Sequence, residues 1–152
     1  MYYSPLRYPG GKGKLASFME YMIDQLGHQG GTYIEPFAGG AGIAMELLLR
    51  NVVSRIVIND YDKAVWSFWK AILTETDRFV EEIRTVPLTV DEWQKQHKIL
   101  VTQNDKYSFE LGFAAFYLNR TNRSGIIKGG VIGGQEQAKD WKMDVRFKRE
   151  EL

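Results

Sequence analysis

Apolar positions recur at helical spacing along most of this 152-residue chain. From residue 14 to residue 26 they fall at steps of three and four, which predicts an amphipathic helix ended by the glycines of residues 27–31. Residues 32–35 predict a short buried strand, and residues 55–59 contain the run Ile-Val-Ile, typical of a central parallel strand with both faces covered. A predicted helix over residues 42–50 joins them, which makes one right-handed strand-helix-strand unit.

Helices with recognisable first residues follow. Asp62 can cap a helix whose apolar residues keep helical spacing, and Pro87 closes the segment after it. Thr89 and Glu92 match a capping box at the start of the next helix, and Ser108 can cap another. We assign the large aromatic residues of this part to packing rather than to ligand binding: Trp66, Trp69, Phe79 and Trp93.

The end of the first strand carries the most informative pattern. Glu35-Pro36-Phe37 leads into glycines at positions 39, 40 and 42, where a helix begins. Glycines let the backbone turn sharply and let a ligand approach the main chain, and a helix start directs N–H groups at that ligand. Asp60 ends the second strand about twenty residues later, where doubly wound folds place an acid against a ribose. The pattern predicts a nucleotide-type pocket.

Two common nucleotide sites do not match. The glycines do not follow the G-x-G-x-x-G order of dinucleotide sites. The segment Gly10-Gly11-Lys12-Gly13-Lys14-Leu15 lacks the Ser or Thr that follows the lysine of a Walker motif. A plain NAD or ATP site is therefore disfavoured.

Charge and composition add little that is specific. The net charge is +1, but residues 1–19 and 111–135 carry basic and no acidic side chains. These stretches can face a polyanion along one surface, or they can be ordinary solvated loops. The chain has no cysteine, no signal-peptide pattern and no apolar run of membrane-spanning length. We expect a cytoplasmic protein without a membrane partner and without a metal site.

Four segments in order resemble the Dam-like adenine-specific DNA methyltransferases: residues 6–12, 35–42, 58–62 and 116–121. In that family the first two bind S-adenosylmethionine, and the acid after the second strand holds the ribose. Carried over, Lys12 would reach the methionine carboxylate, Glu35 would lie near the methionine end, and Asp60 would bind the ribose. The implied cofactor residues are Tyr8, Gly10, Gly11, Lys12, Glu35, Pro36, Phe37, Gly39, Gly40, Gly42 and Asp60.

Each polar assignment has a structural alternative. Lys12 can be a solvated loop lysine, Glu35 can cap the helix that follows it, and Tyr8 can be a core aromatic residue. A fixed cation and a fixed anion nevertheless suit a zwitterionic amino-acid tail, and Lys12 and Glu35 supply them.

The glycine-rich segment of residues 121–134, a predicted loop or irregular hairpin, resembles the start of the family's DNA-recognition region. The candidate contacts with double-stranded DNA are Asn119, Arg120, Arg123, Ser124 and Lys128, and Asn122 is a further candidate for hydrogen bonds to bases. Asn119 and Arg120 can instead brace the cofactor half against the recognition half.

The expected fold class is α/β, a partial doubly wound, Rossmann-like methyltransferase fold. We expect a cofactor-binding part over residues 1–86 and, over residues 87–152, a helical segment that begins the DNA-recognition region. The family's Asp-Pro-Pro-Tyr motif, which grips the flipped adenine, is absent, because the prolines stand at 5, 9, 36 and 87. No catalytic residue is therefore assigned in this chain. We interpret it as the N-terminal part of a longer enzyme, completed by a C-terminal polypeptide or by self-association.

The resemblance implies transfer of a methyl group from S-adenosylmethionine to the exocyclic amino nitrogen of adenine in DNA, with this chain alone inactive. Two other hypotheses stay open. One is a non-catalytic module that binds S-adenosylmethionine or DNA, and the other is an assembly fragment that binds neither.

Overall fold

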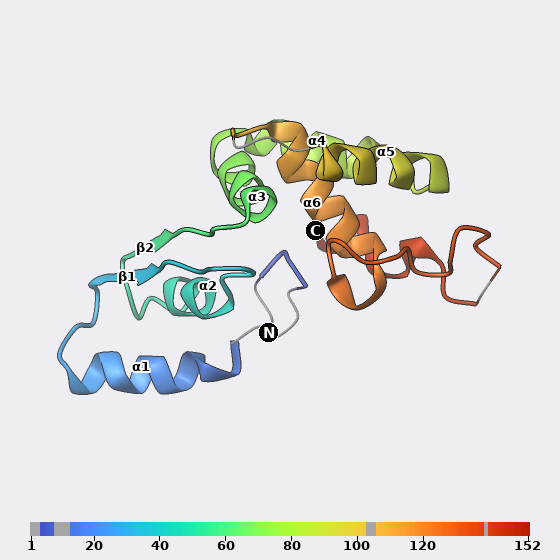
Figure 1. Ribbon diagram of the computed structural model, residues 1–152. Helices are drawn as coiled ribbons and strands as arrows, with labels where there is room; N and C mark the ends of the chain where they lie inside the picture. Colours follow the sequence, from blue (N-terminus) through green and yellow to red (C-terminus); the bar gives the residue numbers. More distant parts are fainter. Residues whose placement is uncertain (1–3, 8–12, 103–105, 139) are drawn as a thin grey trace. The chain divides into compact units, whose positions relative to one another are not determined.

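The computed structural model describes residues 4–7, 13–102, 106–138 and 140–152, which form two compact units divided between Tyr61 and Asp62 (Figure 1). Among the described residues, the first unit is mixed α/β and the second is helical. The functional division expected at residue 86 is a different boundary, and it stays a prediction.

The first unit is a strand-helix-strand arrangement preceded by a helix. Its elements are the short 3-10 turn η1 (Gly13–Leu15), α1 (Ala16–Gln25), β1 (Thr32–Glu35), α2 (Gly42–Leu49) and β2 (Arg55–Ile58). The two strands pair in parallel, with Thr32 opposite Arg55 and Glu35 opposite Ile58. The predicted strands and the helix between them are confirmed to within one residue, and both strands end at the same edge of the sheet.

One face of this strand pair carries the core of the first unit. Tyr33 and Ile56 point from the strands toward Ile43 and Leu47 of α2. Val53 completes the buried cluster, against which Met19 and Ile23 of α1 and Val52 also pack. The strands are therefore covered by helices on this face.

The opposite face contradicts the expectation of strands covered on both sides. Exposed and half-buried residues alternate along both strands, and the Ile34 side chain is 62% exposed. Val57 on the neighbouring strand is 39% exposed. An apolar run is typical of a doubly covered strand, but the second covering layer is absent from the described residues. The apolar run in these strands is therefore typical of a larger sheet, in which both faces are covered.

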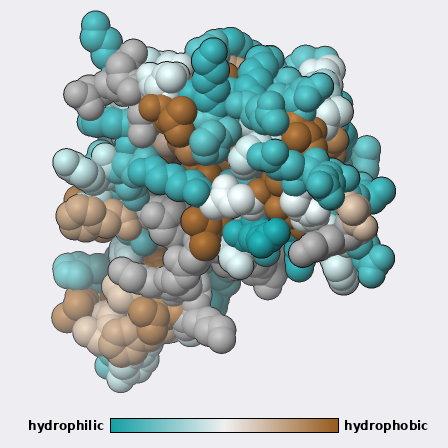
Figure 2. All heavy atoms as spheres, turned by 45° about the vertical axis from the view of Figure 1, so that its right-hand side comes forward, coloured by the Kyte–Doolittle hydropathy of each residue, from teal (hydrophilic) through white to brown (hydrophobic). Residues whose placement is uncertain are grey.

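Helix α1 also differs from the expectation. Only Met19 and Ile23 of its predicted apolar face pack against the core cluster. Other members of that face are exposed: Leu15, Phe18, Met22 and Leu26. Figure 2 shows apolar atoms in brown at the surface between the polar ones. The core cluster therefore covers only part of the predicted apolar face of this helix.

The second unit is built around one helix that is apolar on nearly all sides. Its helices are α3 (Lys63–Thr74), α4 (Thr76–Thr85), α5 (Val90–Val101) and α6 (Phe109–Thr121), with short 3-10 turns η2 (Arg123–Gly125), η3 (Met143–Arg146) and η4 (Arg149–Glu151). Every residue of α6 except Glu110 and Arg120 is buried. A helix of this composition must be enclosed, and α6 packs against both α3 and α5.

Aromatic rings fill the space around α6. Phe116 stacks on Phe68 of α3 with ring centroids 6.0 Å apart and meets Phe79 of α4 edge to face at 5.4 Å. Phe147, close to the end of the chain, contacts Phe116 at 5.7 Å. Trp69, Phe79 and Trp93 are buried, as their assignment to packing predicts.

The predicted helix starts in this unit are confirmed by their caps. The Ala64 N–H donates to the Asp62 carboxylate at 2.8 Å. The Thr89 and Ser108 hydroxyl oxygens accept in the same way from backbone N–H groups three residues ahead, at 3.2 and 3.1 Å. Each cap satisfies a donor that would otherwise lack a partner in the first turn of the helix.

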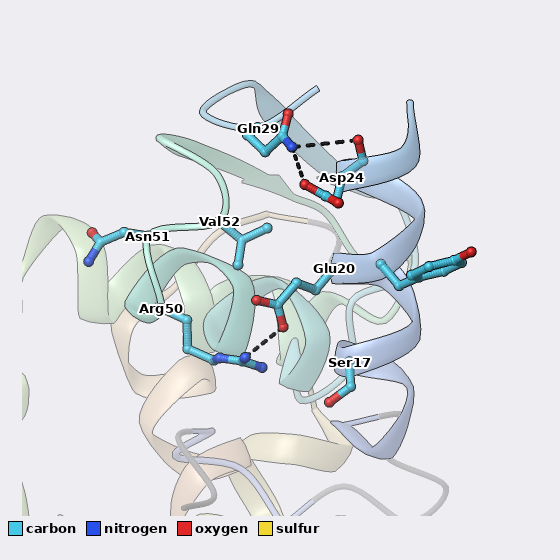
Figure 3. Close-up of a pocket in the computed structure, with 8 residues that line it drawn as sticks. Ser17, Glu20, Asp24, Gln29, Arg50, Asn51 and Val52 are labelled. Atoms are coloured by element: carbon cyan, nitrogen blue, oxygen red, sulfur yellow. Dashed lines mark hydrogen bonds and ion pairs between the residues drawn. The ribbon is translucent and has the colours of Figure 1, made fainter. Parts of the chain in front are cut away.

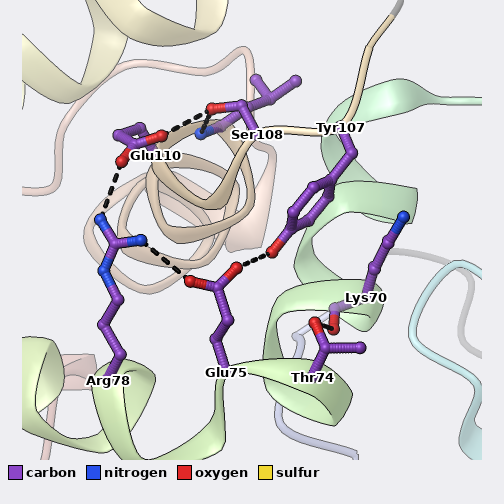
Figure 4. Close-up of polar contacts among 8 residues, drawn as sticks. Lys70, Thr74, Glu75, Arg78, Tyr107, Ser108 and Glu110 are labelled. Atoms are coloured by element: carbon purple, nitrogen blue, oxygen red, sulfur yellow. Dashed lines mark hydrogen bonds and ion pairs between the residues drawn. The ribbon is translucent and has the colours of Figure 1, made fainter.

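A surface ion network ties α4 to the start of α6 (Figure 4). Arg78 donates to Glu75 at 2.9 Å and to Glu110 at 2.8 Å, and the Tyr107 hydroxyl donates to Glu75. The bond from Tyr107, followed by the bond from Arg78, lowers the pKa of the Glu75 carboxyl. Because Glu75 and Arg78 remain accessible to water, the network orients the chain more than it stabilises it.

Candidate functional site

The glycine loop leaves β1 at the edge where both strands end. Backbone pairing continues past the strands, because the Asn59 N–H donates to the Glu35 carbonyl at 3.1 Å and the Ala38 N–H donates to the Asn59 carbonyl at 2.9 Å. Gly39 and Ala41 then adopt left-handed conformations, with φ of 48° and 47°. These two residues turn the chain back into α2.

Asp60 holds this loop directly. The Gly39 N–H donates to the Asp60 carboxylate at 2.7 Å, across 21 residues of sequence. The distance fits a short, charge-assisted hydrogen bond. The structure thus brings together two predicted cofactor residues, the glycine loop and the acid after β2.

Glu35 contacts the other side of the same loop. Its carboxylate accepts from the Ala44 N–H at 3.3 Å, in the first turn of α2. A carboxylate there satisfies a helix donor and lies at the positive end of the helix dipole. This is the capping alternative left open by the sequence, and the carboxylate still lies beside the loop where a ligand group would approach.

Ser4 is a residue of this site that sequence reasoning missed. It is 5% exposed, and its hydroxyl donates to the Gly40 carbonyl of the glycine loop. The hydroxyl oxygen also accepts from the Leu6 N–H at 3.3 Å, and Leu6 is fully buried. Ser4 therefore anchors the N-terminal segment on the loop. A serine before a proline, as at Ser4 and Pro5, is typical of an ordinary turn. The sequence therefore gave no signal that Ser4 contacts the glycine loop.

Two aromatic side chains stand exposed at the same strand ends. Phe37, a predicted pocket residue, is 78% exposed, and Tyr61, which sequence reasoning did not select, is 86% exposed. Phe37 lies two residues after the end of β1, and Tyr61 lies three residues after the end of β2. Tyr61 directly follows Asp60, and an aromatic residue at that position was the signal by which the sequence could have identified it as a site residue.

The remaining predicted cofactor residues differ in their exposure, and some of them lie outside the described residues. Pro36 is exposed, Gly40 is buried and Gly42 begins α2. The N-terminal group lies outside the described residues: Tyr8, Gly10, Gly11 and Lys12. A Cβ on Gly42 would lie 3.5 Å from the Gly13 Cα, so the chain just after that group passes close to the start of α2.

A separate pocket of about 520 Å³ lies beside α1 in the first unit (Figure 3). Glu20 and Asp24 of α1 line it together with Arg50, which pairs with Glu20 at 2.6 Å. Gln29 and Asn51 also line it and precede the two strands, so the pocket lies away from the strand ends where ligands of open α/β sheets bind. It contains none of the predicted cofactor residues.

Residues 121–134 were predicted as a loop or an irregular hairpin, and the structure shows a hairpin, with an isolated antiparallel bridge between Asn122 and Val131. Asn119 is fully buried, and its side-chain amide donates to the Gly125 carbonyl at 2.7 Å. Its enclosure fits a bracing role within this hairpin. Asn122, considered for base contacts, is also fully buried, and its amide donates to the carbonyls of Ile126 and Ile127.

The charged candidates stand around the turn of this hairpin. Arg123, Ser124 and Lys128 are exposed, and Ser124 has a left-handed backbone with φ of 57°. Arg120 is half-buried and lies over the Phe116 ring at 5.9 Å. The hairpin therefore presents Arg123 and Lys128 outward and keeps its asparagines inward.

Two features are absent from the part of the chain that the structure describes. No group of three or more His, Asp or Glu side chains that could hold a metal ion occurs in that part of the chain. No helix there has the length and apolar character needed to cross a membrane.

The type II methyltransferase M.MjaIII of Methanocaldococcus jannaschii is 26% identical to this chain over 105 residues, which cover 66% of the chain and 36% of that relative. The chain therefore spans about a third of the length of the relative. The family model for D12 class N6 adenine-specific DNA methyltransferases matches residues 8–137, which include the glycine loop, Asp60 and the hairpin. The chain belongs to the D12 class of N6 adenine-specific DNA methyltransferases.

Proposed function

We propose that this chain supplies the S-adenosylmethionine site and a first DNA-contacting loop of a DNA adenine methyltransferase. The observation that carries the proposal is the hydrogen bond from Gly39 to Asp60, which joins the glycine loop to the acid after β2. This contact places a carboxylate, a sharply turned backbone and a helix start at one edge of a parallel strand pair. Such an edge is where open α/β folds bind nucleotide-like ligands.

The side chains present fit S-adenosylmethionine in charge and hydrogen bonding. The ribose of this cofactor carries two hydroxyl donors, and a carboxylate such as Asp60 can accept about four hydrogen bonds. Support of Gly39 and binding of a ribose are therefore compatible roles for Asp60. The Glu35 carboxylate suits the positively charged amino group of the methionine end.

Each remaining cofactor residue has a proposed role. Phe37 and Tyr61 offer exposed rings for the adenine, and the backbone of residues 39–42 forms the floor of the pocket. Lys12 would bind the methionine carboxylate, with Tyr8, Gly10 and Gly11 beside it. When bound, S-adenosylmethionine supplies an electrophilic methyl group, and these residues hold and orient it.

The hairpin after α6 is proposed to contact double-stranded DNA. Arg123 and Lys128 are exposed cations on one turn, suited to phosphate groups or to a guanine edge. Ser124 can add a hydrogen bond, and Asn119 and Arg120 support the turn from α6. The target adenine must leave the base stack before its amino nitrogen can be reached.

The strand pair is proposed to be part of a doubly wound, Rossmann-like sheet. The exposed side chains of Ile34 and Val57 form an apolar face that a further layer would cover. That layer would come from a C-terminal polypeptide or from self-association. In this arrangement residues 1–86 serve the cofactor, and residues 87–152 begin DNA recognition.

Calorimetric titration of the chain tests the proposal. We expect heat of binding with S-adenosylmethionine and with its demethylated product, because both carry the same ribose and amino-acid groups. ATP and NAD serve as controls that share the adenosine but lack the methionine end, and we expect at least tenfold weaker binding for them. Equal binding of all four compounds, or of none, would contradict the assignment.

A non-catalytic binding module is the second candidate, and one observation favours it. The 152 residues contain no Asp-Pro-Pro-Tyr segment for gripping an adenine. This candidate predicts cofactor or DNA binding without methyl transfer, even after a polypeptide that carries Asp-Pro-Pro-Tyr has been added. Methyl transfer in that mixture would exclude it.

A further inference from the structure

The indole of Trp93 donates a hydrogen bond into the base of the hairpin that carries Arg123 and Lys128. Trp93 lies on α5 and is 8% exposed, and its Nε1–H group donates to the Asn122 side-chain oxygen at 2.6 Å. Asn122 directly follows α6 as its C-cap residue. The contact therefore links two helices at the point where the hairpin begins.

Asn122 transmits this contact to the turn. Its amide nitrogen donates to the Ile126 carbonyl at 3.1 Å and to the Ile127 carbonyl at 2.9 Å. With the oxygen bonded to Trp93, all three of these hydrogen bonds depend on one orientation of the amide. Rotation of the amide by half a turn would direct its oxygen at two carbonyls, so the indole selects the orientation that holds the turn.

The segment held in this way is short and otherwise weakly supported. Among the described residues, the backbone-to-backbone hydrogen bonds of residues 123–130 lie within the hairpin, such as Arg123 N–H to the Gly130 carbonyl at 3.0 Å and Gly129 N–H to the Ile126 carbonyl at 2.8 Å. Asn119 adds one bond, to Gly125. Buried amides that bond backbone carbonyls can fix a loop that has no regular secondary structure of its own.

We propose that Trp93 and Asn122 are positioning residues that fix the shape of residues 123–130 and thereby set how tightly Arg123 and Lys128 hold DNA. Neither residue touches DNA in this role. The inference rests on the proposed function of the hairpin, but the conformational part can be measured without DNA.

The test uses Trp93→Phe, which removes the N–H donor and keeps an aromatic ring. Trp69→Phe is the matched control, because Trp69 is 5% exposed in α3 of the same unit. Amide hydrogen exchange measured by NMR should become about tenfold faster at Ile126 and Gly129 in Trp93→Phe only, which corresponds to loss of one buried hydrogen bond. Equal exchange rates at these amides in both variants would overturn the inference.

Affinity for a short DNA duplex, measured by fluorescence anisotropy, forms the second arm. We expect Trp93→Phe to bind about tenfold more weakly than Trp69→Phe. Lys128→Ala should also weaken binding less in the Trp93→Phe background than in the unmodified chain, because the lysine is then no longer held in place. An additive double variant would overturn the positioning role.

Failure of the function and failure of the inference can be distinguished. If the unmodified chain binds no duplex, the proposed DNA role of the hairpin fails, and the inference fails with it. If it binds and Trp93→Phe binds equally well, only the inference fails. If Trp93→Phe does not fold, hydrogen exchange of the Trp93 indole N–H is measured in the unmodified chain instead. We expect this N–H to exchange slowly with solvent. Exchange as fast as that of the exposed Trp141 indole would overturn the inference.

Discussion

Ala41 occupies a backbone conformation that suits glycine. Its φ of 47° and ψ of 35° are left-handed, which costs a non-glycine residue about 1–2 kcal/mol. Its methyl group is fully buried, however, and removal of a buried methyl group costs about 0.8 kcal/mol. We expect Ala41→Gly to leave the free energy of unfolding unchanged or to raise it by up to about 1 kcal/mol, because the relief of strain offsets the lost methyl group.

Ala44 is the matched control for this change. It is also fully buried, but it lies inside α2, so Ala44→Gly should cost about 1.5–2 kcal/mol from the lost methyl group and the poor helix propensity of glycine. Urea denaturation of both variants provides the measurement. An equal loss of stability in both would mean that Ala41 carries no strain.

Tyr117 makes the second unit sensitive to alkaline pH. Burial raises the pKa of its hydroxyl well above the ordinary tyrosine value of about 10, and the hydroxyl donates to the Pro87 carbonyl at 3.0 Å. When folding raises the pKa of a group, the stabilisation that this group contributes is fully present at pH values below its pKa in the unfolded chain. For a tyrosine, that stabilisation is lost as the pH rises above about 10. Thermal midpoints of the unmodified chain should therefore fall above pH 10.

Tyr117→Phe should reduce that fall, while costing about 1 kcal/mol at pH 7 for the lost hydrogen bond. Tyr21→Phe, at an exposed position on α1, is the control and should leave the alkaline profile unchanged. A profile equally steep in Tyr117→Phe would show that the burial of this hydroxyl does not govern alkaline unfolding.

At the level of helices, Gly112 sets the contact between α3 and α6. A Cβ at this position would lie 2.6 Å from the Ser67 carbonyl oxygen and 2.9 Å from the Phe68 nitrogen, both backbone atoms. Since backbone cannot move aside cheaply, we expect Gly112→Ala to destabilise the unit by about 2–3 kcal/mol. Gly130→Ala, with no atom within 4 Å of the added carbon, should change stability by less than about 0.5 kcal/mol. Similar denaturation midpoints for the two variants would refute this close approach.

Element boundaries could be predicted from the sequence because local chemistry decides them. Asp62, Thr89 and Ser108 cap the helices that follow them, and the glycine-rich hairpin was readable from its composition. The segment between the helix capped by Asp62 and Pro87 was separated from that helix but was not assigned as a helix, although it forms α4. The exposed sides of β1, β2 and α1 were also not predicted, since burial depends on which layers are present and not on local pattern.

The candidate site was predictable only in part for a related reason. The glycine loop, Glu35 and Asp60 share short motifs, and the structure brings them together at one sheet edge. Ser4 and Trp93 act through contacts with residues 36 and 29 positions away in the sequence, which no local spacing signals. Asn122 was misread because an exposed amide and a buried one look the same in sequence.

For the molecule as a whole, we expect cofactor binding without turnover. Transfer of tritiated methyl groups to DNA free of adenine methylation should stay at background for this 152-residue chain, because it contains no Asp-Pro-Pro-Tyr segment. Heat-inactivated protein gives the background level. Label in N6-methyladenine above that level would show that the chain grips adenine by other residues.

The double role proposed for Asp60 offers the most direct measurement of the central proposal, that the loop between β1 and α2 is the S-adenosylmethionine site. Asp60→Asn keeps an oxygen that can accept from the Gly39 N–H but loses the charge, whereas Asp60→Ala loses both. Asp77→Asn, at an exposed position on α4, is the control.

Calorimetric titration with S-adenosylmethionine should show affinity about tenfold weaker for Asp60→Asn, at least about a hundredfold weaker for Asp60→Ala, and unchanged for Asp77→Asn. Unchanged affinity in a folded Asp60→Ala variant would contradict the claim.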